Sequence, residues 1–189
     1  RHAARTSIAG TVESIAEITA DTLYDCHKAF YTPSNMILTV VGNVDPVHVA
    51  DLARSILPRE GGPVIPRDYG QEPPQVAERE TRLAMEVSAP QFLTAYKCTP
   101  AADGEDYLRM AVLGDMACDL LLGDSSPLYQ RLYEEGLINT SFGGAFEMMP
   151  GVAYLYAGGD SKDANAVTDA ILREAARIAA EGVDEDYFR

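Results

Sequence analysis

The rest of the chain is organised around the stretch TADTLYDCHKAFYTPSNMILTVVGNVD, residues 19–45. Thr19 predicts the start of a helix, because its hydroxyl can accept a hydrogen bond from a free amide of the first turn. Pro33 ends that helix, since proline cannot continue it. Between these two residues, apolar and aromatic side chains recur on one helical stripe. The stripe consists of Leu23, Cys26, His27, Phe30 and Tyr31.

A buried strand is predicted directly after this helix. Residues 36–41, MILTVV, are almost entirely apolar and rich in β-branched side chains. The run is short enough for a strand that is covered on both faces. Gly42-Asn43 ends it with turn residues. Asp45 followed by Pro46 then predicts a second helix, which we expect to reach residue 57.

Residues 58–80 predict a linker between two domains. The segment holds five of the eleven prolines and three glycines of the chain. Proline restricts the backbone, so such a segment is extended and semi-stiff. We therefore divide the chain into residues 1–57, this linker, and residues 81–189.

The second part begins with strands. Apolar side chains alternate over residues 83–87, which predicts a half-buried strand, and a second strand is predicted over residues 91–98. Asp103 is expected to cap a long helix that ends near residue 122. This helix is apolar nearly all round, so we expect it to be buried.

A shorter helix is predicted to begin at Ser126-Pro127 and to close at Gly136. Strands over residues 137–147 and 152–158 should form a hairpin, and Ser161 is expected to cap the last long helix. The element order predicts an α+β fold with a mainly antiparallel sheet and helices packed on one face. Both parts are expected to be incomplete, because one strand between two helices cannot pair its own edges.

The composition excludes several classes of partner. The chain is 47% hydrophobic and 23% charged, as is typical of a soluble globular protein. Its net charge of −14 argues against nucleic acid and anionic membranes as partners. No apolar run approaches the ~18 residues of a membrane span. Most of the acidic excess lies in residues 83–189, where it forms either a solvated helix surface or a site for basic peptides.

The three cysteines are far apart in the sequence. Cys26, Cys98 and Cys118 include no C-x-x-C pair, which disfavours a zinc ribbon or a redox pair. Cys26 and Cys118 lie within helical apolar patterns, so we expect buried free thiols. Free thiols are typical of a reducing compartment, and this predicts a cytoplasmic location.

Three segments together resemble a known family. Residues 30–46, FYTPSNMILTVVGNVDP, resemble the signature segment of the M16 (insulinase, or mitochondrial-processing-peptidase-like) zinc metallopeptidases. Residues 8–19, IAGTVESIAEIT, resemble the family's approach to that helix. Residues 124–138, which are Asp124 and then SSPLYQRLYEEGLI, resemble the S-x-L-x-x-x-L-x-E-x-G-L stretch of the second domain. The resemblance implies the closing part of one M16 domain, the linker, and the opening part of the next.

The catalytic motif of that family is missing from the sequence. In M16 enzymes the histidines of H-x-x-E-H bind zinc, and the glutamate serves as the general base. Here the only histidines are His2, His27 and His48, and none stands four residues from another. The resemblance therefore implies that zinc is bound upstream, outside this fragment. We assign no catalytic residue and no metal ligand, and substrate-binding residues stay unassigned.

Local groupings of reactive side chains favour structural roles. His27 beside Cys26 cannot converge on one metal, because consecutive helical residues point about 100° apart. Ser126 before Pro127 is typical of a helix cap, with a nucleophile as the alternative. Lys97 beside Cys98 could lower the pKa of the thiol, but neighbouring strand residues point to opposite faces.

Two positions depart from the family pattern. Tyr133 stands where many members have arginine, and Asn139 stands where an aromatic residue is usual. Both changes lie in the second-domain stretch. They argue against a peptide-contact role for it.

The leading hypothesis is a non-catalytic portion of an insulinase-like zinc peptidase that helps to enclose a peptide chamber. The alternative is a catalytically inert M16-like scaffold or partner subunit, and a third reading is an unrelated α+β binding module. The expected partners are a peptide substrate or an M16-like partner subunit. We also expect a symmetric homodimer in which residues 19–57 of one copy pack on the sheet of the other.

Overall fold

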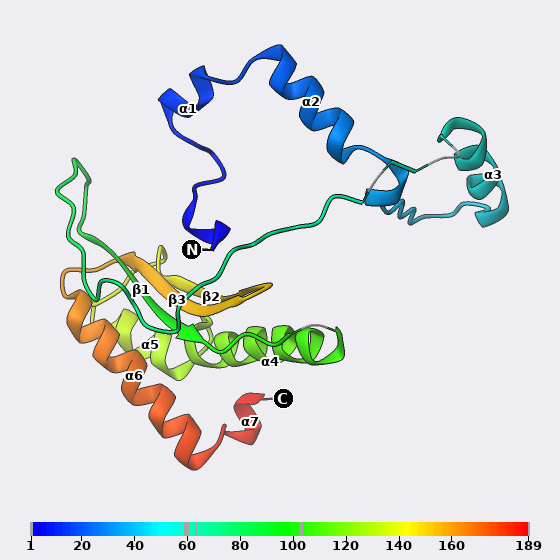
Figure 1. The fold of residues 1–189 in the computed structure, drawn as a ribbon. Helices are drawn as coiled ribbons and strands as arrows, with labels where there is room; N and C mark the ends of the chain where they lie inside the picture. The colour runs from blue at the N-terminus through cyan, green and yellow to red at the C-terminus, as the bar shows by residue number, and fades with distance from the viewer. Residues whose placement is uncertain (1, 59–60, 63, 103, 189) are drawn as a thin grey trace. The chain divides into compact units, whose positions relative to one another are not determined.

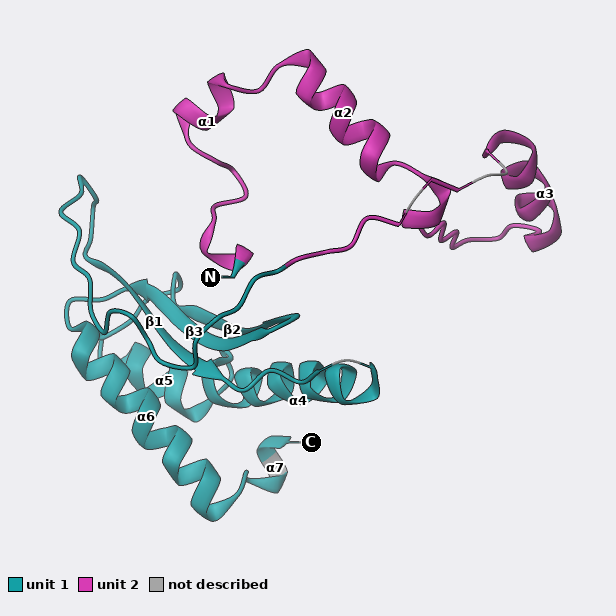
Figure 2. Ribbon diagram, in the orientation of Figure 1, with its two compact units in different colours: residues 1–2, 69–189 teal, residues 3–68 magenta. Residues whose placement is uncertain are grey.

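A three-stranded antiparallel sheet lies at the centre of the larger of two units. The computed structural model describes residues 2–58, 61–62, 64–102 and 104–188. The chain divides into one unit of residues 1–2 and 69–189 and another of residues 3–68 (Figure 2). The strands are β1 (Gln91–Cys98), β2 (Gly143–Met149) and β3 (Val152–Asp160), in the order β1-β3-β2. β3 is therefore the central strand, and β1 and β2 form the two edges.

The hairpin of β2 and β3 was predicted from its turn. Pro150 and Gly151 connect the two strands, and Gly151 has φ +83°, a conformation that glycine adopts without strain. β2 begins at Gly143, six residues later than expected. The preceding residues form a loop instead, because the side chain of Asn139 accepts a hydrogen bond from the amide of Ser141 at 2.8 Å.

Three helices cover one face of this sheet, and the α+β prediction is confirmed (Figure 1). They are α4 (Gly104–Leu122), α5 (Pro127–Glu134) and α6 (Ala164–Glu181), and a short α7 (Glu185–Phe188) follows. The core lies where they meet the sheet. Its buried members are Cys118, Leu121, Leu122, Leu128, Leu132, Ile138, Phe142, Ala157, Val167, Ala170 and Ile171.

The long helix α4 is less buried than its apolar sequence predicted. Only Cys118, Leu121 and Leu122 are buried, all in its last two turns. Leu108 keeps 65% of its surface exposed and Leu113 keeps 52%. α4 packs most extensively against β2 and makes smaller contacts with α5, α6 and β3. The predicted cap, Asp103, lies outside the described residues.

The last long helix begins later than predicted. The side chain of Asp163, not that of Ser161, accepts the hydrogen bond from the amide of Ala166 at 3.0 Å. Ser161 accepts one from the amide of Asp163 at 3.1 Å. Both residues can cap a helix, and the sequence alone did not decide between them.

The unit of residues 3–68 is built from short helices. These are η1 (Ala3–Arg5), α1 (Val12–Ala16), α2 (Ala20–Phe30), η2 (Pro33–Asn35) and α3 (Pro46–Ile56). The two predicted caps are confirmed. Thr19 accepts from the amide of Thr22 at 3.2 Å, and Asp45 accepts from the amide of Val47 at 2.8 Å. No described residue of this unit is buried.

The strand expected over residues 36–41 is not formed. The segment belongs to no sheet, and Ile37 and Val41 keep 94% and 93% of their surface exposed. Residues 83–87 likewise form no strand, and Leu83 is 79% exposed. A pattern of side chains predicts that a segment can be extended. A strand also needs a neighbour for its backbone groups, and no described residue supplies one to either segment.

Candidate functional site

The three histidines differ in their local surroundings. The imidazole Nε2 of His2 lies 2.7 Å from the carbonyl oxygen of Pro150, and the ring stacks on Tyr69. The ring of His27 is exposed and stacks on Tyr31 at 4.9 Å between centroids. His48 is exposed on the first turn of α3. In the described part of the chain, no three His, Cys, Asp or Glu side chains gather where they could hold a metal ion.

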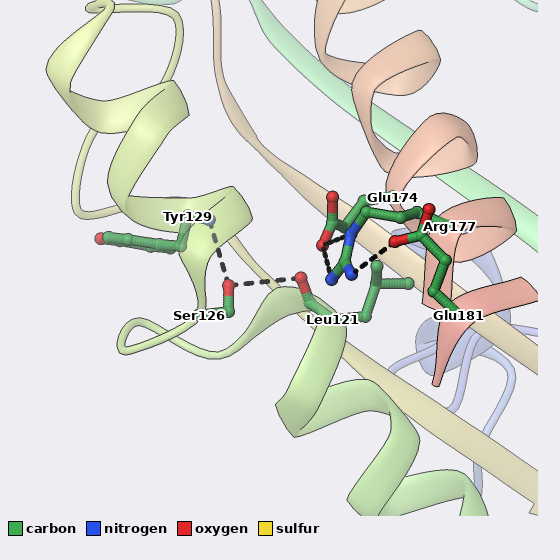
Figure 3. Close-up of polar contacts among 6 residues, drawn as sticks. All are labelled: Leu121, Ser126, Tyr129, Glu174, Arg177 and Glu181. Atoms are coloured by element: carbon green, nitrogen blue, oxygen red, sulfur yellow. Dashed lines mark hydrogen bonds and ion pairs between the residues drawn. The ribbon is translucent and has the colours of Figure 1, made fainter. Parts of the chain in front are cut away.

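The motif of residues 124–138 forms α5 and its two ends. Ser126 is fully buried, and its hydroxyl accepts from the amide of Tyr129 at 3.0 Å and donates to the carbonyl of Leu121 at 3.3 Å (Figure 3). The capping role predicted for Ser126 is confirmed. Leu128 and Leu132 each keep 1% of their surface exposed, so the leucines of the motif anchor the helix in the core.

A glycine turn closes the same helix. The amide of Gly136 donates to the carbonyl of Tyr133 at 3.0 Å, and the amide of Leu137 donates to that of Leu132 at 3.0 Å. This pair of bonds is the Schellman arrangement, which needs a left-handed residue at its turn. Gly136 has φ +67°. The G-L pair of the motif is therefore explained by the geometry of the helix end.

The two residues that depart from the family pattern lie on the surface of this region. Tyr133 is 49% exposed and stacks on Tyr129, with 6.0 Å between ring centroids. Asn139 donates through Nδ2 to a carboxylate oxygen of Asp160 at 3.2 Å. Its own side-chain oxygen accepts from the hydroxyl of Ser141 at 2.6 Å.

Asn139 thereby ties the loop before β2 to the end of β3. Gln91 on β1 donates to the other carboxylate oxygen of Asp160 at 3.2 Å. Hydrogen bonds from Asn139 and Gln91 hold the pKa of Asp160 below its usual range, with a smaller contribution from Ser141. The Asn-x-Ser pattern is a known turn signal, but the partnership with Asp160 is not visible in the sequence because 21 residues separate it from Asn139.

Glu174 and Arg177 line a groove between α5 and α6 and belong to an ion-pair network on α6. The guanidinium of Arg177 donates to Glu174 at 2.7 Å and 3.1 Å and to Glu181 at 3.5 Å (Figure 3). Only 10% of the Glu174 side chain is exposed, so its carboxylate needs this partner. The network holds the side chains of Glu174, Arg177 and Glu181 together along α6.

The lysine and the cysteines do not form a reactive site. Lys97 pairs with Glu72 and also donates to the carbonyl of Pro73 at 2.9 Å. Cys98 lies on the other face of β1 and is partly buried. Burial raises the pKa of Cys118, which disfavours its thiolate. Cys26, which was expected to be buried, is exposed because the stripe of α2 has no described partner.

Comparison with known proteins shows the family to which the chain belongs. A family model described as the peptidase M16 inactive domain matches residues 17–189. The chain belongs to the M16 peptidase family. The resemblance drawn from the three sequence segments is confirmed, and the match is to the family's inactive, C-terminal-type domain.

Several M16-like proteins are similar to the chain over nearly its whole length. It is 35% identical over 191 aligned positions to the zinc protease YmfH of Bacillus subtilis (strain 168). It is 31% identical to an M16-like peptidase from Alicyclobacillus acidocaldarius, with a TM-score of 0.82 over 98% of the chain. A protease from Helicobacter pylori, 23% identical with a TM-score of 0.73 over 94% of the chain, shares the fold.

The chain spans less than half of these relatives. The matched region covers 97% of this chain but 45% of YmfH. It covers 44% of the chain from Alicyclobacillus acidocaldarius and 44% of the chain from Helicobacter pylori. The activity of a whole M16 protein therefore cannot be transferred directly to these residues.

Zinc, which the family implies, does not fit the described residues. A zinc site needs three or four converging Cys, His or carboxylate ligands. His27 and His48 are exposed on different helices of the smaller unit, and His2 belongs to the other unit. No step of a zinc reaction is assigned to this chain. Nor is any helix of its described residues long and apolar enough to cross a membrane.

Proposed function

We propose that this chain is the non-catalytic portion of an M16 zinc-protease-like protein, where it helps to enclose the chamber in which peptides are cleaved. The family match to the inactive domain carries the proposal. M16 inactive domains typically pair with a catalytic M16 half. In this proposal the zinc ligands and the general base lie in that half, within the H-x-x-E-H motif.

The absence of a core in the described part of residues 3–68 supports such pairing. No described residue of this unit is buried, and its apolar stripes on α2 and α3 are exposed. Phe30 is 48% exposed and Leu52 is 51% exposed. Each large apolar side chain gains about 1.5–3 kcal/mol when it is fully buried. A catalytic half that covers these stripes would therefore be held by ordinary hydrophobic burial.

The experiment is co-expression of the chain with a tagged M16 half that carries H-x-x-E-H. We expect the two to purify together in equal amounts. The matched control replaces Phe30 and Leu52 by Asp, which should weaken the association while leaving α4–α6 folded. Failure of the unaltered chain to associate at micromolar concentration would contradict the proposal.

A second candidate is an inert scaffold or partner subunit, and the motif departures favour it. Tyr133 and Asn139 replace an arginine and an aromatic residue in the second-domain stretch, and Asn139 serves a structural network instead. The sequence upstream of Arg1 in the parent discriminates the two candidates. H-x-x-E-H there supports a protease, and its replacement by other residues supports a scaffold.

We also propose a cytoplasmic location and, as an alternative to pairing with a catalytic half, a homodimer that covers the same apolar stripes of α2 and α3. Ile37 and Val41 are almost fully exposed, which supports packing of residues 19–57 on the sheet of a second copy. Light scattering at micromolar concentration tests this: a mass of about 40 kDa, twice that of one chain, is expected, and a monomer would contradict it.

The three free thiols support a reducing compartment. Cell fractionation checks that location, and recovery outside the cytoplasm would contradict it.

A further inference from the structure

The groove between α5 and α6 has an apolar floor and a charged rim. Its volume is about 540 Å³, which lies within the roughly 300–1,000 Å³ of small-molecule sites. Leu132, Ala166 and Ala170 line it, and of these Leu132 and Ala170 are buried members of the core. Arg131 and Arg173 also line it, and both are exposed. The groove therefore offers an apolar surface and positive charges to the same ligand.

The two arginines of the rim have no counter-charge. Neither Arg131 nor Arg173 takes part in an ion pair with another described residue. Glu135 lines the groove as well, but it is exposed to solvent, which screens its charge. A guanidinium group binds a carboxylate through two parallel hydrogen bonds. Arg131 and Arg173 are therefore able to hold a carboxylate, even though the chain as a whole has a net charge of −14.

Glu174 adds a hydrogen-bond acceptor to the same groove. It keeps only 8% of its surface exposed, and both of the hydrogen bonds that it accepts from Arg177 reach the same oxygen, Oε1 (Figure 3). Its other oxygen, Oε2, has no hydrogen-bond partner among the residues that the structure describes.

The unbonded oxygen of Glu174 is accessible to solvent. In the described part of the chain, no fully buried side-chain oxygen lacks a partner, so Oε2 is not fully buried. The groove is an opening that Glu174 lines. A carboxylate oxygen that is otherwise buried and still lacks a donor is able to accept one from a ligand.

We propose that this groove binds an α-amino acid with an apolar side chain. The carboxylate of the amino acid pairs with Arg131 and Arg173, its ammonium donates to Oε2 of Glu174, and its side chain lies on the apolar floor. A simple anion would leave Oε2 without a donor, and a simple cation would be repelled by the two arginines. An α-amino acid carries both charges on one carbon atom, so both fall within a single groove. The two ends of a peptide are farther apart and satisfy these groups less well.

This inference goes beyond the proposed function and does not rest on it. The groove is formed by α5, α6 and the turn after α5. The apolar stripes proposed to contact a catalytic half lie instead on α2 and α3, in the unit of residues 3–68. Loss of amino-acid binding would leave association with that half unchanged, and failure to associate would leave the groove intact.

The first test is an NMR titration of the full, isotope-labelled chain with L-leucine. We expect saturable shifts at the amides of Leu137, Ala166 and Ala170, which line the groove, with a dissociation constant of about 1 mM or lower. No saturation by about 10 mM leucine would overturn the proposal. Saturable shifts confined to residues outside the groove would overturn it as well.

Two derivatives of leucine test the two charges of the ligand separately. N-acetyl-L-leucine lacks the ammonium, and L-leucinamide lacks the carboxylate. Each should bind at least about tenfold more weakly than leucine, because each loses a charge-assisted hydrogen bond. Equal affinities for all three compounds would show apolar contact alone and would overturn the zwitterion as the ligand. Tighter binding of N-acetyl-L-leucine would overturn it too, since a simple anion would then occupy the groove.

A pair of arginine variants tests the carboxylate contact. Arg131→Gln with Arg173→Gln should weaken leucine binding at least about tenfold without weakening the binding of leucinamide, which has no carboxylate. The matched control, Arg67→Gln with Arg109→Gln, removes the same charge from residues that do not line the groove. It should leave the affinity for leucine within about twofold. Equal losses in the two pairs would contradict the assignment.

Glu174→Gln tests the ammonium contact. Glutamine keeps an oxygen that accepts from Arg177 but removes the negative charge, so leucine should bind more weakly while the affinity for N-acetyl-L-leucine stays within about twofold. An unchanged affinity for leucine would contradict the role of Oε2. If this variant does not fold, the arginine pair and the leucine derivatives still decide the proposal, because the arginines are exposed and the derivatives are tested on the unaltered chain.

Discussion

At the scale of single residues, Ser126 decides how α5 is joined to α4. Its hydroxyl serves both the amide of Tyr129 and the carbonyl of Leu121 in a fully buried position. Ser126→Ala should therefore lower the free energy of unfolding by about 1–2 kcal/mol, because a helix cap is lost and a buried carbonyl is left without a donor. Urea denaturation followed by circular dichroism measures this. Ser125→Ala, at the exposed neighbouring serine, should change stability by less than about 0.5 kcal/mol, and equal losses would contradict the capping role.

Asp160 gives a residue-scale prediction in pH. Its pKa is lowered from 3.8, most of all by the hydrogen bond from Asn139 and next by that from Gln91. A carboxyl whose pKa is lowered in the folded state contributes its full stabilisation at pH values above its unfolded pKa. That contribution disappears as the pH falls through the folded pKa. Asn139→Ala should therefore raise the pKa of Asp160 toward 3.8.

Titration of the Asp160 carboxyl by NMR measures the change directly. Gln91→Ala should shift the pKa of Asp160 in the same direction by a smaller amount, since its hydrogen bond is the second cause. The part of the stability difference that comes from the ionised Asp160 should vanish at a pH below the folded pKa, while in Asn139→Ala the loss of the hydrogen bonds from Ser141 persists at every pH. An unchanged pKa in Asn139→Ala would show that this bond does not form in solution.

At the scale of elements, α4 and β2 meet at Gly114. A Cβ placed on Gly114 would lie 2.1 Å from the ring of Phe146 on β2, so no side chain fits without moving that ring. Gly114→Ala should destabilise the chain by about 1–3 kcal/mol through overpacking, although alanine favours a helix by about 1 kcal/mol. Gly143→Ala is the matched control, because nothing lies within 4 Å of its added Cβ. Denaturant titrations of both variants check the contrast, and a stabilised Gly114→Ala would show that the ring is free to move.

The elements also show what the sequence could predict. Thr19, Asp45 and Ser126 mark helix starts correctly, because a cap acts on an amide two or three residues away. The β2–β3 hairpin was predictable for the same local reason. Residues 36–41 and 83–87 have strand-like patterns but form no strand, since pairing depends on a partner that a local pattern does not contain. The hydrogen bond between Asn139 and Asp160 could not be predicted either, because the two residues are distant in the sequence and a local pattern does not show which residues meet.

At the scale of the whole molecule, the domain limits at residues 57 and 81 remain a prediction. The described part of residues 58–80 contains neither helix nor strand. Its prolines and glycines deny it a hydrogen-bonded ladder, so we expect it to be the internal segment most sensitive to protease. Limited trypsin digestion should cut first at Arg67 or Arg79, as mass spectrometry of the fragments would show. A first cut at Arg109 or Arg131, both on helices of the larger unit, would mean that the boundary is misplaced.

We propose that this M16 chain completes a peptidase without supplying its catalytic groups. The most direct measurement is the rate of cleavage of a fluorogenic peptide by an H-x-x-E-H-bearing M16 half, with and without the chain. We predict cleavage that requires the chain, is abolished by a zinc chelator, and is lost when the glutamate of the motif is replaced by glutamine. Cleavage by the chain alone, or by the catalytic half at the same rate whether or not the chain is present, would contradict the claim.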